Sequence, residues 1–284
     1  MTRTALILEG GALRGQYTAG VLDTFMAHQQ FFDLVVGVSA GALCGTNYIS
    51  QQPGRTDRIN VMYRHDKNYI SLRRALRRQD IINLDYLFAP HGDTWEDFDE
   101  ATYAASPMRF VITATSLSLG RAIYFTHPTG AALVGALKAS SAMPFISAPA
   151  QTTRGLCLDG GIVDSIPFHY ALGAGVDRIV VIRTRERTYR KHQTGAVLAR
   201  AYARAFAPYP DFVQAAIARP TMYNRQADEL VDLENAGRLF VIAPQQPVNV
   251  SRLEGDTTKL QALYETGRRE ATALLPAMQA YLQG

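Results

Sequence analysis

The sequence predicts a mixed α/β fold of three layers, in which helices cover both faces of a central sheet that is mainly parallel. Two observations predict it. Short β-rich apolar runs alternate with segments of helical periodicity, an alternation typical of parallel sheets, whose strands need crossover connections. The 284 residues are also 47% hydrophobic and 19% charged, which excludes a disordered chain and supplies side chains for a large core.

The predicted strands are apolar runs that end at turn residues. Residues 4–8 end at Glu9 and two glycines, and residues 34–38 lead into small helix-forming residues from Ala40 onward. The other predicted strands are 109–115, 122–126, 156–158, 178–184 and a last one at 238–243.

Helices are predicted between these strands and after them. In residues 16–28, Tyr17, Val21 and Phe25 are spaced as one face of a helix. The other predicted helices are 130–143, 196–206, 221–236 and 257–282, with Pro208, Pro210 and Pro220 separating two of them and a break before Pro276.

The alternation ends at a charged connection, residues 185–191. We therefore expect a catalytic core at 4–184 and a mainly helical C-terminal elaboration at 185–284, packed on that core.

Charge and cysteine content exclude several classes of protein. The net charge of +4 is too small to argue for nucleic acid, although it suits an anionic membrane surface. Two cysteines, Cys44 and Cys157, exclude a disulfide scaffold, and no residues have the spacing of metal ligands, so we expect neither metal nor cofactor. No segment suits a secretory signal or a membrane span, so we expect a cytoplasmic protein. Nothing in the sequence indicates the oligomeric state.

The strongest candidate for chemistry is the segment Gly37-Val38-Ser39-Ala40-Gly41. It joins a predicted strand to a predicted helix, which is the setting of a nucleophile elbow. Such a turn exposes the serine hydroxyl, the glycines relieve crowding, and the helix N-terminus supplies positive potential for an oxyanion. The alternative is a helix start at which Ser39 is only the N-cap.

A second glycine-rich segment, residues 9–15, also joins a strand to a helix. Glycines permit a tight turn that directs backbone N–H groups at an anion. One interpretation is an oxyanion hole made by the amides of Gly10, Gly11 and Ala12, with Arg14 holding the loop or adding charge. The alternatives are a phosphate or nucleotide loop, for which Ala12 stands where the dinucleotide motif has glycine, and a plain turn.

A third segment places Asp159 at the end of a short predicted strand, before Gly160 and Gly161. Taken alone, this is a common turn sequence. A nucleophilic serine needs a proton acceptor, however, and an aspartate on a tight, accessible turn can serve as one.

These three motifs, in this order, resemble those of the patatin-like phospholipase family of lipid acyl hydrolases. That family has a G-G-x-x-[RK]-G loop, then G-x-S-x-G, then D-G-[GA], and residues 139–144 are similar to its A-S-x-A-x-P segment. The resemblance covers residues 4–184 and implies a patatin-like three-layer domain. It also implies that Ser39 is the nucleophile and Asp159 its base, in a dyad without histidine that forms an acyl-enzyme from a phospholipid or another acyl ester.

The resemblance also implies an oxyanion hole at Gly10, Gly11 and Ala12, where Ala12 replaces a frequent glycine. It implies supporting positions around the loops at Arg14, Gly15, Gly37, Gly41, Gly160 and Gly161.

Three other functions stay open. An α/β-hydrolase triad would need His169 or His192, since no other histidine follows Asp159. A non-hydrolytic module would bind phosphate or nucleotide at residues 10–15. A lipid-surface protein would dock on anionic membranes through four arginines that share a helical face, unless that face is merely solvated: Arg73, Arg74, Arg77 and Arg78. Clustered aromatic residues either line an acyl pocket or belong to the core: Tyr63, Tyr69, Tyr86, Phe88 and Trp95.

Overall fold

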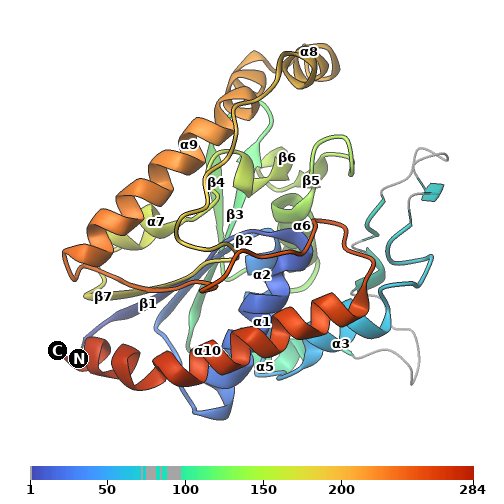
Figure 1. Cartoon of the computed structure of the whole chain (residues 1–284). Coiled ribbons are helices and arrows are strands. Elements are labelled where there is room, and N and C mark those ends of the chain that lie inside the picture. The colour runs from blue at the N-terminus through green and yellow to red at the C-terminus, as the bar shows by residue number, and fades with distance from the viewer. Residues whose placement is uncertain (1, 72, 75–80, 84, 88–96) are drawn as a thin grey trace.

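A computed structural model of the chain describes residues 2–71, 73–74, 81–83, 85–87 and 97–284. Within these residues, eight strands form one sheet (Figure 1). The strands are β1 (Thr4–Leu8), β2 (Leu34–Val38), β3 (Arg109–Ser116), β4 (Ala122–Thr126), β5 (Ala150–Thr152), β6 (Gly155–Asp159), β7 (Arg178–Ile182) and β8 (Phe240–Ile242).

Hydrogen bonds link the strands in the order β5-β6-β3-β2-β1-β7-β8, and β4 also pairs with β3. The pairs β8–β7, β7–β1, β1–β2 and β2–β3 are parallel, whereas β4, β5 and β6 pair antiparallel. This confirms the expected sheet, in which parallel strands predominate.

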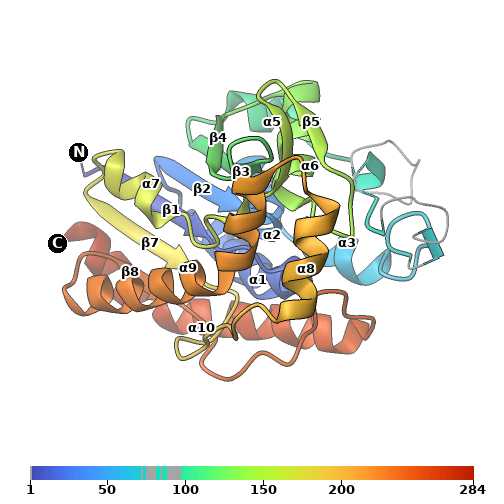
Figure 2. The ribbon, with the colours of Figure 1, turned by 90° about the horizontal axis from the view of Figure 1, so that it is seen from above.

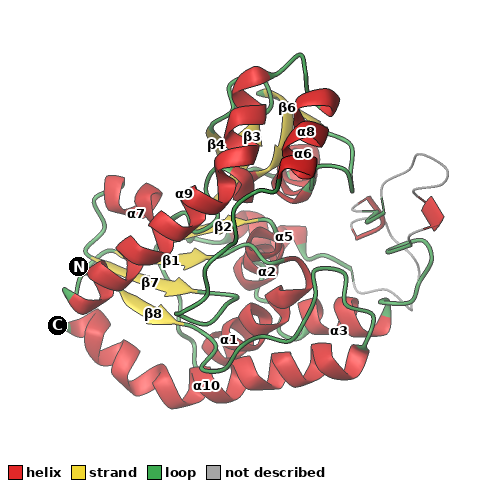
Figure 3. Cartoon of the chain, turned by 45° about the horizontal axis from the view of Figure 1, so that its top comes forward, coloured by secondary structure: helices red, strands yellow, loops and turns green. Residues whose placement is uncertain are grey.

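Helices cover both faces of the sheet, as the rotated views show (Figures 2 and 3). The helices are α1 (Gly15–Ala27), α2 (Ala40–Ile49), α3 (Arg55–Met62), α5 (Glu100–Ala105), α6 (Gly130–Ser141), α7 (Phe168–Gly173), α8 (Ala196–Ala205), α9 (Pro210–Asn235) and α10 (Thr257–Gln283). Short 3₁₀ turns lie at Ala12–Arg14, Asp85–Leu87 and Gly160–Ile162.

The alternation of side chains along β1 explains the three layers. Leu6 and Leu8 pack with residues of α1, α2, α5, α6 and α10, whereas Ala5 and Ile7 pack with residues of α7 and α9. Because successive side chains of a strand point to opposite faces, an all-apolar strand needs helices on both sides. The sequence-predicted three-layer α/β class is therefore confirmed.

The region after residue 185 contributes to all three layers. Strand β8 extends the sheet beside β7, α9 covers one face, and α10 packs along α1 on the other. A Cβ on Gly20 of α1 would overlap the carbonyl oxygen of Tyr264, and one on Gly267 of α10 would overlap that of Tyr17. The two glycines thus permit the close approach of these helices.

Three proline positions differ from the sequence expectation. Helix α9 begins at Pro210 and continues through Pro220, and α10 continues through Pro276 without a break. Pro210 stands in the first turn of α9, where backbone N–H groups have no acceptor within the helix. The N–H that proline lacks therefore costs the helix no hydrogen bond. Pro220 is buried in the helix interior, so packing of α9 on the sheet offsets the hydrogen bond that the proline removes.

Part of the arginine face and of the aromatic cluster lies outside the described residues, namely Arg77, Arg78, Phe88 and Trp95. Arg73 is exposed, and Tyr69 is buried in a small cluster with Ile59 and Ile70. No helix in the described part of the chain is long and apolar enough to cross a bilayer.

Candidate active site

Ser39 lies in the turn between β2 and α2 with a φ of 55° and a ψ of −125°. This is strained backbone for a residue with a side chain, as expected of a nucleophile elbow. A Cβ on Gly37 would lie 2.8 Å from the backbone of Ala42, and one on Gly41 would overlap the carbonyl oxygen of Leu8. The two glycines are needed because the turn is packed against its neighbours.

The hydroxyl of Ser39 does not cap the helix that it precedes. Instead, Oγ donates a hydrogen bond to Oδ2 of Asp159 at 2.9 Å, and both side chains are buried. The N-cap interpretation of Ser39 is therefore wrong for this structure.

The geometry of β3 explains why two residues so distant in sequence meet. Val111 and Thr113 pair with β2 on one edge of β3 and with β4 on the other, and Ala114 pairs with both β4 and Asp159. Strand β6 must therefore share the edge of β3 that β2 occupies. Because β2 runs parallel to β3 and β6 runs antiparallel, their C-terminal ends face each other and bring Ser39 to Asp159.

Asp159 is held by several groups besides Ser39. Its Oδ1 accepts the N–H of Gly161 at 2.7 Å, and its own N–H donates to the carbonyl of Ala142 at 2.8 Å. Burial raises the pKa of Asp159, against the opposing effects of Arg219, of the hydrogen bonds from Gly161 and Ser39, and of Arg252. A raised pKa makes this carboxylate a better proton acceptor than an exposed aspartate.

Ser140 connects the segment 139–144 to the elbow. Its Oγ accepts the N–H of Ser39 at 2.7 Å and donates to the carbonyl of Thr113 at 2.7 Å. Sequence reasoning noted this segment but assigned no role to Ser140. The structure shows that it fixes the backbone of Ser39 relative to β3.

The glycine-rich loop lies against the elbow. A Cβ on Gly10 would lie 3.2 Å from the Cβ of Ser39, and one on Gly11 would lie 2.7 Å from Oγ1 of Thr184. The N–H of Gly10 donates to the carbonyl of Ser165 at 3.3 Å, whereas among the described residues no acceptor is found for the N–H groups of Gly11 and Ala12. Ala12 adopts a left-handed φ of 51°, which explains why glycine is favoured at this position.

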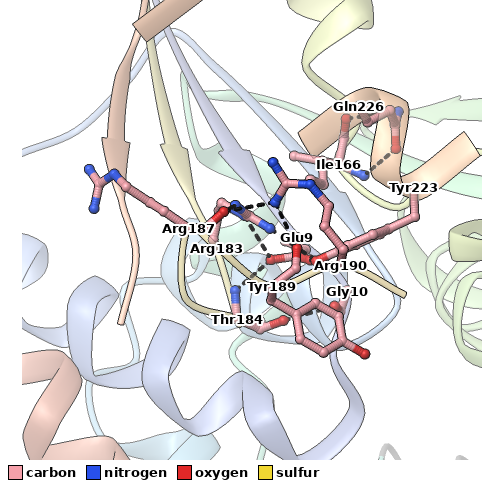
Figure 4. Close-up of polar contacts among 10 residues, drawn as sticks. All are labelled: Glu9, Gly10, Ile166, Arg183, Thr184, Arg187, Tyr189, Arg190, Tyr223 and Gln226. Atoms are coloured by element: carbon pink, nitrogen blue, oxygen red, sulfur yellow. Dashed lines mark hydrogen bonds and ion pairs between the residues drawn. The ribbon is translucent and has the colours of Figure 1, made fainter. Parts of the chain in front are cut away.

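Glu9 anchors this loop through a buried network that the sequence did not reveal (Figure 4). Its Oε2 accepts the N–H of Thr184 at 2.6 Å, and its Oε1 accepts the hydroxyl of Tyr223 at 2.7 Å. The fully buried Arg183 donates to the hydroxyl of Tyr223 at 3.1 Å and lies 3.7 Å from Oε2 of Glu9. These contacts connect the C-terminal ends of β1 and β7 to α9. No motif or spacing pairs these residues.

Two hollows meet at Ser39. The first hollow has a mainly apolar wall made by Ala12, Leu13, Ala40, Leu43, Cys44, Ile59, Tyr69, Ile70, Ile82 and Met143. Polar residues complete its lining, among them Asn47, Arg55, Asn60 and Arg252. The other hollow is polar and contains Asp159, the glycine-rich loop and several basic side chains. An apolar channel beside a nucleophile suits an acyl chain, and a polar one suits a hydrated head group.

The histidines considered for a triad lie elsewhere. His169 pairs with Glu229 at 2.8 Å on the surface, and His192 is exposed. Within the described residues, no histidine lines either hollow at Ser39. The same part of the chain contains no group of three or more histidine, cysteine or carboxylate residues placed to hold a metal ion.

Comparison with protein families agrees with the motifs. A family model described as "Patatin-like phospholipase" matches residues 6–172. A second model, described as a domain of unknown function (DUF6363), matches residues 209–283.

Curated relatives are similar over part of their length. The uncharacterized protein YjjU of Escherichia coli is 34% identical over 196 residues, covering 64% of this chain and 52% of YjjU. A cGAMP-activated phospholipase of Pseudomonas aeruginosa is 27% identical, covering 60% and 56%. An uncharacterized NTE family protein of Mycobacterium tuberculosis is 26% identical, covering 63% and 48%. The chain thus spans about half the length of the curated relatives it matches.

Among solved structures, VipD from Legionella pneumophila is similar with a TM-score of 0.44 and 11% identity. The match covers 98% of this chain and 67% of VipD.

Proposed function

The chain belongs to the patatin-like phospholipase family, and on that premise we propose that it is a serine lipid acyl hydrolase with a Ser39–Asp159 dyad. The observation that carries the proposal is the direct hydrogen bond of 2.9 Å from Ser39 Oγ to Asp159 Oδ2. A carboxylate with a raised pKa, bonded to a serine on a strained elbow, is equipped to act as its general base.

In the acylation step, Ser39 Oγ attacks the carbonyl carbon of the ester while Oδ2 of Asp159 takes the hydroxyl proton. The tetrahedral intermediate carries its negative charge on the former carbonyl oxygen. We assign its stabilisation to the N–H groups of Gly11 and Ala12 and to the α2 N-terminus, with Gly10 bringing the loop against Ser39. The intermediate collapses, the ester C–O bond breaks, and protonated Asp159 returns the proton to the leaving alcohol.

In the deacylation step, Asp159 takes a proton from a water molecule, which attacks the acyl–Ser39 ester. Collapse of the second intermediate releases the fatty acid and returns the proton to Ser39. The apolar hollow beside Ser39 would hold the acyl chain in both steps, with Leu43, Ile59 and Tyr69 in its wall.

A fluorophosphonate probe tests this proposal, because it labels only serines that are activated as nucleophiles. We expect labelling and hydrolysis of acyl esters by the wild type, and loss of both in Ser39→Ala, with kcat reduced by several orders of magnitude. Ser118→Ala, which alters an exposed serine, is the matched control. Unlabelled wild-type protein that binds phosphate or nucleotide at residues 10–15 would contradict the proposal and favour the binding module.

Peripheral contact with an anionic membrane belongs to the same proposal, since a lipid hydrolase works at a surface. Its support is the basic face, of which Arg73 is exposed. Replacing Arg73, Arg74, Arg77 and Arg78 by glutamine should weaken binding to anionic vesicles, by about 1 kcal/mol per charge. Binding equal to that of the wild type would show that this face is only solvated.

A further inference from the structure

The polar hollow at Ser39 is lined by several basic side chains. Its lining includes five basic side chains: Arg14, Arg185, Lys191, Arg219 and Arg252. The carboxylates in the lining are Glu9 and Asp159. Within the described residues, the hollow therefore carries more positive than negative charge beside the reactive hydroxyl.

Both carboxylates are already engaged by other groups. Glu9 accepts hydrogen bonds from Thr184 and Tyr223 and lies beside Arg183, which does not line the hollow. Asp159 accepts those of Ser39 and Gly161. They offset part of the positive charge of the hollow, but within the described residues neither carboxylate forms an ion pair with the five basic side chains.

Hydrogen bonds and a contact with an aromatic ring hold Lys191 in place. Its backbone exchanges hydrogen bonds with the side chain of Asn224 at 2.7 and 3.0 Å, which fixes the connection to α9. Its Nζ lies 3.4 Å from the ring centroid of Tyr223. Within the described part of the chain, Lys191 forms no ion pair, and neither does Arg252.

The basic groups repel one another. Burial lowers the pKa of Lys191, and the charges of Arg219, Arg252 and Arg14 lower it further, against the effect of Glu9. Burial likewise lowers the pKa of Arg14 to about 10, with Arg252 among the charges that add to the effect. Basic side chains that lie close together and lower one another's pKa are stabilised when an anion binds between them.

Arg219 and Arg252 connect this cluster to the two loops of the site. Nε of Arg219 donates to the carbonyl of Gly161 at 2.6 Å, beside Asp159. The carbonyl of Arg252 accepts the N–H of Leu13 at 3.4 Å, beside the glycine-rich loop. Lys191, Arg219 and Arg252 all lie beyond residue 172, where the match to the patatin-like phospholipase model ends, and Arg219 and Arg252 fall within the match to DUF6363.

We propose that Lys191, Arg219 and Arg252 bind the phosphate group of a phosphate-bearing lipid while its acyl ester lies at Ser39. The inference rests on the proposed hydrolase function and assigns the residues that would recognise a phosphate on its substrate. In a glycerophospholipid the phosphate is only a few bonds from the scissile carbonyl, and the two hollows meet at Ser39. The acyl chain and the phosphate can therefore occupy the apolar and polar hollows together. Guanidinium and ammonium groups form charge-assisted hydrogen bonds with phosphate oxygens.

The test compares phosphatidic acid with diacylglycerol of the same acyl chains, each dispersed in neutral detergent micelles. We expect the wild type to prefer phosphatidic acid in kcat/KM. In Lys191→Gln combined with Arg252→Gln, the ratio of the two kcat/KM values should fall about tenfold or more, mainly through KM for phosphatidic acid. Arg269→Gln, an exposed cation on α10, is the matched control and should leave the ratio unchanged.

The outcomes separate this inference from the proposed function. A wild type that cleaves both lipids equally, or a double variant with an unchanged ratio, would overturn the phosphate site and leave the hydrolase intact. A wild type that cleaves no acyl ester would overturn the proposed function itself. If inorganic phosphate alters diacylglycerol hydrolysis while the lipid preference is absent, the hollow binds a free anion, and the assignment to the lipid is overturned.

Discussion

Replacing Asp159 by asparagine separates its chemical role from its cost to the fold. The asparagine side chain has nearly the same shape, and its Oδ1 can still accept the N–H of Gly161, a bond of 2.7 Å in the wild type. The amide cannot take the proton of Ser39 at neutral pH. A general base typically contributes about 10²–10⁴ in rate, so we expect kcat to fall by at least this amount.

The same substitution should stabilise the protein, because burial raises the pKa of Asp159 above its unfolded value. A raised pKa means that the folded protein binds the proton more tightly than the unfolded chain. The stability from this group is present below the unfolded pKa near 3.8 and is lost as pH rises through the folded pKa. Asparagine never ionises, so Asp159→Asn should gain about 0.5–2 kcal/mol at neutral pH, a few degrees in Tm.

The assays are ester hydrolysis and thermal unfolding of the same preparations between about pH 4 and pH 8. The stability gain should shrink toward acid pH. The wild-type kcat/KM should fall on the acid side at a pH above the ordinary aspartate pKa of 3.8, as Asp159 becomes protonated. Asp164→Asn is the matched control, since burial also raises the pKa of Asp164, which is bonded to Gln226 and Tyr124.

The control should gain stability with the same sign and retain hydrolysis within about tenfold. If Asp159→Asn keeps more than about a tenth of the wild-type kcat, Asp159 is not the base. If it is less stable than the wild type at neutral pH and more stable at acid pH, the account of its burial is wrong.

Four other substitutions test three separate parts of the structure. Gly11→Val should fold but lose about 10²–10³ in kcat, because a Cβ placed 2.7 Å from Thr184 must displace the donor amides; unchanged kcat would remove the loop from the reaction. His169→Gln and His192→Gln should each keep kcat within about tenfold and preserve the acid limb of the pH profile, whereas collapse of activity in either would indicate a triad. Gly267→Ala should lower the free energy of unfolding by about 1–3 kcal/mol in denaturant melts, because α10 must move away from α1; unchanged stability would show that this contact is not tight.

The sequence by itself determined the chemistry-bearing segments, because their signals are local. Alternating strand and helix patterns predicted the three-layer sheet. The glycines around Ser39 predicted a turn that exposes its hydroxyl, and the two glycines after Asp159 predicted the turn that carries the carboxylate. Each of these follows from a few consecutive residues, whose φ and ψ preferences act within a single turn.

Only the tertiary structure decided which of these residues meet. Ser39 and Asp159 are 120 positions apart and touch because β6 runs antiparallel along the same edge of β3 as β2, next to the C-terminal end of β2. No local pattern encodes the direction in which a distant strand pairs or the edge at which it pairs. Both depend on how the whole sheet satisfies its backbone hydrogen bonds and buries its apolar side chains. For the same reason, no local pattern indicated the hydrogen bond that the hydroxyl of Tyr223, in α9, donates to Glu9. Nor did any local pattern indicate the convergence of Lys191 with cations from other segments, whose charges only the folded chain brings into one hollow.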